Sequence, residues 1–136
     1  MRILIPCTIL LLLLSSFVPT HAARVKMTAN NVDDRIDIYL DGTHQDTCTW
    51  SSNPGCFAGV KGNLSGSHDI RFKLTNYVYN GFCLFGRCGK YSADLAIRSN
   101  GNQIWSKSLS RRDNSAGVKY DRTIRCNFDN GRCWER

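Results

Sequence analysis

The stretch Asp33-Asp34-Arg35-Ile36-Asp37-Ile38-Tyr39-Leu40-Asp41-Gly42 decides the fold class of this chain. Within it, Ile36, Ile38 and Leu40 alternate with polar or aromatic residues, which places three branched apolar side chains on one face of a strand. Asp41-Gly42 supplies the turn chemistry that ends such a strand. The stretch therefore predicts a half-buried β-strand followed directly by a turn.

The same alternation returns further along the chain. Residues 67–76 alternate strictly between apolar and polar side chains, which predicts a second strand. Residues 92–109 are typical of a hairpin, because Asn100-Gly101 is a favoured pair for a two-residue type I′ turn, in which both positions need a positive φ. There is no helical stripe of useful length. About six to eight short strands with Gly and Asn turns predict an all-β fold, either an antiparallel β-sandwich or a jelly roll.

The hairpin also predicts a register. With a two-residue turn, Ile97 faces Ile104 and Asp94 faces Lys107, and Trp105 points away from the two isoleucines. A bulged turn would shift the register by one residue and exchange the faces of one strand. If the inner face of the sandwich is the opposite one, Trp105 would be buried.

The first 22 residues have the features of a secretory signal peptide. Arg2 is followed by an apolar run at 3–14 and by small residues in Thr20-His21-Ala22, which predicts cleavage after Ala22 or Ala23. The apolar run is too short for a membrane anchor, which needs roughly 20 residues. We expect a secreted, extracellular protein with one mature domain, residues 23–136, and no later membrane span.

Six of the seven cysteines lie in this mature domain. An even number in an oxidising compartment predicts three disulfides. The spacing favours three local pairs, although fifteen pairings are possible: Cys48–Cys56, Cys83–Cys88 and Cys126–Cys133. A metal site that includes His44 is the weaker alternative.

Asn63-Leu64-Ser65 is an N-glycosylation sequon. In a eukaryotic host it predicts a glycoprotein in which Asn63 lies in a surface loop.

Part of the chain resembles the galactose-binding-like jelly-roll domains. The similarity rests on the strand at 33–42, on Trp50, on Gly66-Ser67-His68-Asp69-Ile70-Arg71-Phe72-Lys73-Leu74-Thr75-Asn76 and on Ala93-Asp94-Leu95-Ala96-Ile97. The resemblance implies a binding module, often for glycans, that uses loops at one end. It transfers no ligand residue, and the cysteines and the basic C-terminal tail lie outside it.

Nothing in the sequence indicates a catalytic site, and we expect no enzyme activity. The mature domain has two histidines, His44 and His68, and His68 fits a structural role at the start of a strand. No nucleophile elbow is present, and the carboxylates are too scattered to indicate a glycosidase pair. No cofactor is expected, although Asp33, Asp34 and Asp41 leave open a structural calcium ion.

Three features could bind a ligand. Trp105, if exposed, would be a flat aromatic platform for a sugar. The loop 77–88 would present apolar and basic side chains on a disulfide-closed tip. From Arg111 to Arg136 there are seven basic and four acidic residues, and the whole chain carries a net charge of +7. The candidate ligand-binding residues are Trp50, Tyr79, Phe85, Arg87, Trp105, Arg111 and Arg112.

These features favour a secreted, non-catalytic binding protein. The first hypothesis is a lectin-like module for a carbohydrate or an extracellular polyanion. The alternatives are a toxin, defence or effector protein that acts on a membrane or receptor, and a structural component of the extracellular matrix. No nucleic-acid motif is present, so nucleic acid is not an expected partner.

Overall fold

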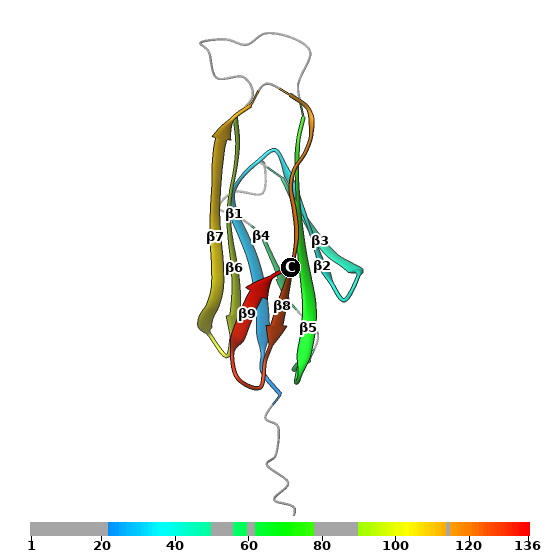
Figure 1. The fold of residues 1–136 in the computed structure, drawn as a ribbon, viewed down its shortest axis with the longest axis vertical. Helices are drawn as coiled ribbons and strands as arrows, with labels where there is room; N and C mark the ends of the chain where they lie inside the picture. Colours follow the sequence, from blue (N-terminus) through cyan, green and yellow to red (C-terminus); the bar gives the residue numbers. More distant parts are fainter. Residues whose placement is uncertain (1–21, 50–55, 60–61, 78–89, 114) are drawn as a thin grey trace, which may run out of the picture.

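The computed structural model describes residues 22–49, 56–59, 62–77, 90–113 and 115–136, with the side chains of 56–58 left out. The described chain forms two antiparallel sheets (Figure 1). The four-stranded sheet has the order β4-β1-β6-β7, and the five-stranded sheet has the order β3-β2-β5-β8-β9. The strands are β1 (Val25–Asp33), β2 (Arg35–Leu40), β3 (Thr43–Thr49), β4 (Cys56–Gly59), β5 (Ser67–Asn76), β6 (Lys90–Ser99), β7 (Asn102–Arg112), β8 (Gly117–Asn127) and β9 (Arg132–Glu135).

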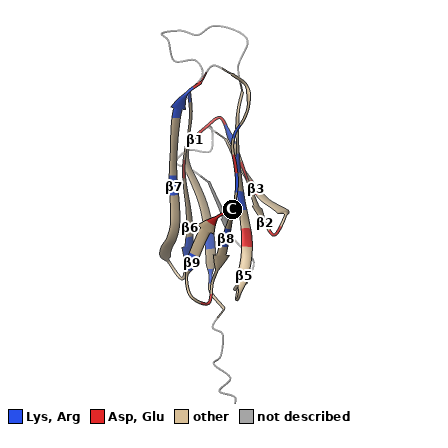
Figure 2. Cartoon of the chain, in the orientation of Figure 1, with Lys and Arg blue, Asp and Glu red and all other residues tan. Residues whose placement is uncertain are grey.

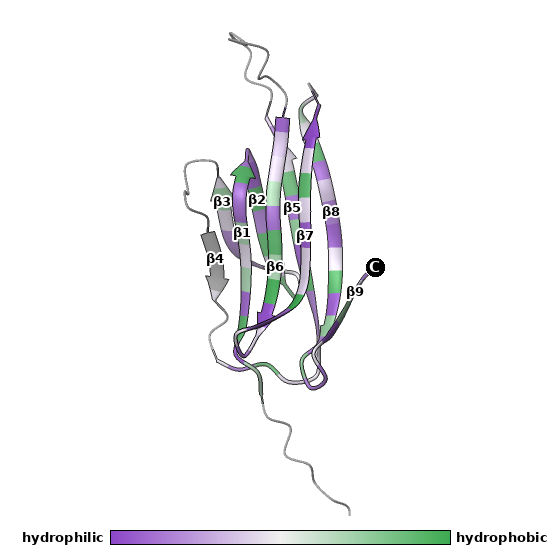
Figure 3. Ribbon diagram, turned by 90° about the vertical axis from the view of Figure 1, so that its left-hand side faces the viewer, coloured by the Kyte–Doolittle hydropathy of each residue, from purple (hydrophilic) through white to green (hydrophobic). Residues whose placement is uncertain are grey.

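The inner faces of the two sheets share one apolar core. β2 and β5 contribute fully buried side chains from the five-stranded sheet, and β1 and β6 contribute them from the other sheet. The alternation of apolar and polar residues is visible along the strands (Figure 3). The prediction of an all-β, antiparallel sandwich is therefore confirmed. The largest apolar side chains of the core are Phe72, Met27, Ile36, Ile38, Ile70, Leu74, Leu95, Ile97 and Ile124.

The stretch that decided the fold class forms a central strand. β2 pairs with β3 on one side and with β5 on the other. Asp41 and Gly42 have positive φ values of 48° and 78°, as the predicted turn requires. β5 matches the second predicted strand, residues 67–76.

The predicted hairpin is present, but its predicted register is wrong beyond the first pairs. Asn100 and Gly101 both have positive φ, and Arg98 faces Gln103 as expected. An irregularity between Ile97 and Arg98 then shifts the pairing, so that Ile97 faces Trp105 instead of Ile104. Because side chains alternate, this one-residue shift exchanges the faces of β7.

The Cys126–Cys133 pairing is confirmed as a disulfide, and it joins β8 to β9. Cys48 is also disulfide-bonded. The predicted partner of Cys48 is Cys56, whose side chain is outside the described residues. The predicted pair Cys83–Cys88 lies entirely outside them. One complete disulfide is thus seen in the part of the chain that the structure describes.

Backbone hydrogen bonds connect the described chain to the rest of the fold from Ala23 onward. The Ala23 nitrogen donates to the Leu64 carbonyl oxygen at 2.6 Å, and the Leu64 nitrogen donates back to Ala23 at 2.9 Å. The Ala23 side chain is buried in the core. Residues 1–21, which include most of the predicted signal peptide, lie outside the described residues. Within the described residues, no helix is long and apolar enough to span a bilayer.

At the other end of the sandwich, a buried amide connects β5 to the segment between β7 and β8. Asn76 is the last residue of β5, and only 1% of its surface is exposed. Its Nδ2 donates to the carbonyl oxygens of Asp113 and Ser115, at 3.2 and 2.9 Å. These two bonds fix where the chain crosses from one sheet to the other.

Candidate functional site

Trp105 faces the core instead of the solvent. Its ring stacks on Phe72, with centroids 5.7 Å apart and planes inclined by 12°. Phe72 is fully buried, and Trp105 packs partly buried against the same core. The predicted register, which turned Trp105 away from Ile97, is therefore wrong, and the alternative in which Trp105 is buried is the one observed.

The predicted residues Trp50, Tyr79, Phe85 and Arg87 lie outside the described residues. Asn63 of the predicted sequon is described, and it is exposed.

Arg111 and Arg112 are exposed at the last two positions of β7. The fold brings them to Lys90, the first residue of β6, because Lys90 is the cross-strand partner of Arg112. Sequence reasoning did not include Lys90, which is 22 positions from Arg112 and joins it only through the hairpin. We call these three residues the basic end.

His68 and the acids around it have partners within the fold. His68 Nδ1 lies 2.7 Å from Asp41 Oδ2, and Nε2 lies 3.0 Å from the Ser65 carbonyl oxygen. Asp33 ends β1 and Asp34 immediately precedes β2, whereas Asp41 lies just after the end of β2, so this strand separates the acids considered for calcium. Among the described residues, no group of three or more His, Cys, Asp or Glu could hold a metal ion.

Charged residues occur along β2, β5 and β8 of the five-stranded sheet, and several of them form ion pairs (Figure 2). Arg71 donates to both carboxylate oxygens of Asp121 at 2.6 Å, and this hydrogen bonding holds the pKa of Asp121 below its usual value. The Arg71 guanidinium also lies 5.4 Å from the centre of the Tyr39 ring. Arg35 donates from Nε and from Nη2 to one oxygen of Asp37, Oδ1, at 3.0 and 2.8 Å. Most of the charged residues on the outer face of this sheet are therefore paired with a residue of opposite charge.

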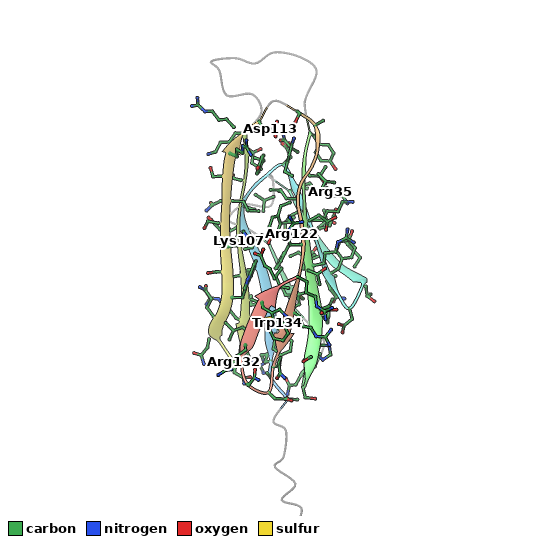
Figure 4. All side chains as sticks on the ribbon, viewed as in Figure 1. Arg35, Lys107, Asp113, Arg122, Arg132 and Trp134 are labelled. Carbon is green, nitrogen blue, oxygen red and sulfur yellow. A yellow bond between two sulfur atoms is a disulfide. The ribbon has the colours of Figure 1, made fainter. Side chains whose placement is uncertain are left out.

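Trp134 on β9 differs from these paired residues, because it is a large aromatic residue exposed on the same face. It lies on the same outer face, opposite Arg125 of β8, and 48% of its surface is exposed. Arg132 and Arg136 are two positions before and after it, so their side chains share its face. Strand pairing and alternation therefore place three arginines on the same face as one exposed indole, and Figure 4 shows Arg132 and Trp134 on β9.

A single carboxylate positions two of these arginines. Asp69 of β5 lies 3.4 Å from Arg125 Nη1 and 3.6 Å from Arg136 Nη1. Each guanidinium carries five N–H donors, so these long contacts leave most donors unused. We call Asp69, Arg125, Arg132, Trp134 and Arg136 the Trp134 site; it contains three cations and one anion.

The local sequence explains why β9 folds back to present this site. Asn127 Oδ1 accepts hydrogen bonds from the backbone nitrogens of Asp129 and Asn130 in the turn. Gly131 follows with a positive φ of 66°. The Cys126–Cys133 disulfide then locks the pair next to Trp134.

Trp134 was missed by sequence reasoning. The signal was the alternation Arg132-Cys133-Trp134-Glu135-Arg136, which puts the cysteine and the glutamate on one face and the other three residues on the opposite face. A strand of four residues is too short to be recognised without its partner.

The chain matches no family model, no curated protein and no solved structure. The resemblance to galactose-binding-like domains is therefore supported only as far as an all-β fold with two antiparallel sheets.

Proposed function

We propose that this is a secreted, non-catalytic binding protein that recognises acidic sugar residues of an extracellular glycan at the Trp134 site. The observation that carries the proposal is the half-exposed Trp134, which shares one face of the sheet with Arg125, Arg132 and Arg136. Trp105, the tryptophan expected to perform this role, packs in the core instead.

The chemistry of the Trp134 site suits a sugar ring that carries a negative charge. An exposed indole offers a flat apolar surface to the C–H face of a pyranose. Arginine guanidinium groups donate two parallel hydrogen bonds to a carboxylate or a sulfate group. Beside these arginines, the Asp69 carboxylate can accept a hydrogen bond from a sugar hydroxyl group. A surface made only of lysines could not make this contact, because ammonium groups only donate.

The charge of the whole chain favours the same class of ligand. The net charge of +7, of which Arg2 in the predicted signal peptide contributes one, attracts polyanions over long range. The paired charges elsewhere on the outer face give little local attraction, because each arginine there already faces an aspartate. An excess of cations remains around Trp134.

The test is binding of the oxidised mature protein to an array of neutral, carboxylated and sulfated glycans at low and high salt. Trp134→Ala should reduce binding at both salt concentrations, because stacking is not screened by ions. Arg132→Gln should reduce binding mainly at low salt.

Arg98→Gln is the matched control, because Arg98 is an exposed arginine on β6 in the other sheet. It changes the net charge as Arg132→Gln does but leaves the Trp134 site intact, so its binding should equal that of the unmodified protein. Equal losses in the two arginine variants would reduce the interaction to net charge alone. Undiminished binding of Trp134→Ala would refute the proposed site, and no binding to any glycan would favour a membrane or receptor target.

A further inference from the structure

The basic end is a cluster of three cations, and within the described residues two of them, Arg111 and Arg112, have no acidic partner. Lys90 and Arg112 are directly opposite on adjacent antiparallel strands, and both are exposed. Like charges in this arrangement destabilise a sheet. Arg111, the neighbour of Arg112, adds a third cation at the same strand end.

The acids near the basic end are already engaged. Asp113 accepts hydrogen bonds from Lys119 at 2.8 Å and from Ser115, which hold its pKa below the usual value. Lys90 attracts the Asp33 carboxylate electrostatically. Among the described residues, neither Arg111 nor Arg112 forms an ion pair with an acidic residue.

The opposite sheet shows that this arrangement is an exception. There, Arg35, Arg71 and Arg125 each lie within 4 Å of an aspartate, at 2.8, 2.6 and 3.4 Å. An external anion that binds beside Arg111 and Arg112 stabilises the strand end, because it reduces the repulsion between Arg112 and Lys90 on neighbouring strands.

The basic end is far from the Trp134 site. Gly131, next to Arg132, lies beside Ile104 of β7. Arg112 is eight positions further along β7 than Ile104, which is roughly 26 Å in an extended strand. The two clusters also belong to different sheets, and Figure 2 shows the basic tip of β7 at the end of the sandwich away from the β8–β9 turn.

We propose that the basic end is a second polyanion-binding site and that one molecule bridges two acidic polysaccharide chains. The bridging role rests on the proposed function of the Trp134 site, whereas binding at the basic end does not. The ligand of the basic end is a sulfate- or carboxylate-bearing polymer held mainly by charge, because the described aromatic residue opposite Arg111, Tyr91, is partly buried against the core. Bivalency of this kind raises the retention of each molecule on a dense glycan layer without any new contact.

The test separates binding from bridging. A basic-end variant carries Lys90→Gln, Arg111→Gln and Arg112→Gln, and a control variant carries Arg24→Gln, Lys73→Gln and Arg98→Gln. Both variants lose three positive charges, but the control leaves both clusters intact. Light scattering with a long sulfated polysaccharide measures cross-linking as the protein-to-polymer ratio is varied, and calorimetry with a short sulfated oligosaccharide measures binding at single sites.

We expect the unmodified protein and the control to give a scattering maximum at intermediate ratio. The basic-end variant should lose most of this maximum while it still binds the short oligosaccharide through the Trp134 site. Equal scattering from the two variants would overturn the second site. If Trp134→Ala leaves oligosaccharide binding unchanged and the basic-end variant abolishes it, the basic end stands and the proposed function of the Trp134 site fails.

Discussion

Lys107 Nζ on β7 lies 2.8 Å from Glu135 Oε1 on β9, and this ion pair connects the edge strands of the two sheets. The same carboxylate accepts a hydrogen bond from the Tyr120 hydroxyl at 3.1 Å, and Lys107 lies 5.3 Å from the centre of the Tyr120 ring. This side of the sandwich is therefore closed by polar contacts. An inward-pointing lysine on an edge strand also discourages pairing with another chain.

Glu135→Gln should lower the free energy of unfolding by about 0.5–1 kcal/mol at pH 7, since both partners are about a third exposed and solvent screens the pair. The hydrogen bond from Lys107 holds the pKa of Glu135 below its usual value of 4.5. A carboxylate with a lowered pKa stabilises the fold above that usual value, and the stabilisation is lost as the pH falls through the lowered pKa. Urea unfolding of both proteins at pH 7 and at pH 2.5 should therefore show a difference that shrinks in acid. A difference that stays constant, or one that persists in a Lys107→Gln background, would contradict this account.

Trp105→Ala should destabilise the protein by about 3 kcal/mol, because it removes a large side chain stacked on the buried Phe72 and leaves a cavity. Thermal unfolding measures the loss. At a temperature where the variant is folded, glycan binding should be unchanged, in contrast with Trp134→Ala, which should keep the stability and lose the binding. Trp105→Phe is the milder control, and it should retain most of the stability. A loss below 1 kcal/mol in Trp105→Ala would place its ring outside the core.

Replacing both Cys126 and Cys133 by alanine should cost about 2 kcal/mol, because the disulfide closes a loop with a sequence separation of 7. The larger effect should be local, since β9 has only four residues and lies at the edge of its sheet. Hydrogen exchange should become fast in 132–135 while it stays slow in β2 and β5. Glycan affinity should fall with it, because Trp134 loses its fixed position. Unchanged exchange in β9 would show that strand pairing alone holds the Trp134 site.

The predicted signal peptide should be removed after Ala22, which leaves Ala23 as the first residue. Ala23 is buried and exchanges two backbone hydrogen bonds with Leu64, whereas cleavage after Ala23 would remove these contacts. Intact-mass measurement of the protein secreted from a eukaryotic host, after enzymatic removal of N-glycans, distinguishes the two products by one alanine. A sample that begins at Arg24 would refute the prediction, and protein engineered to begin there should unfold at a lower temperature.

The sequence predicted the strands whose alternation is long and strict, such as β2 and β5, and the turn at Asn100-Gly101. It could not predict the orientation of Trp105, because the bulge beside Arg98 changes no residue type and leaves no mark on the pattern. The same limit applies to Trp134, whose significance depends on Arg125 of a neighbouring strand. Strand order decides such neighbours, and a pattern of alternation carries no information about strand order.

The buried side-chain amide of Asn76 makes the fold sensitive to deamidation, a covalent change of the side chain alone. Hydrolysis of the amide to a carboxylate would replace its donors with acceptors, and these would face the carbonyl oxygens of Asp113 and Ser115. Loss of the hydrogen bonds of this buried side chain costs about 1–3 kcal/mol, and repulsion from the new charge adds to that cost. The crossing between the sheets, which begins after Arg112 of β7, would then loosen. The integrity of one side-chain amide would therefore decide whether the two sheets stay joined at this end.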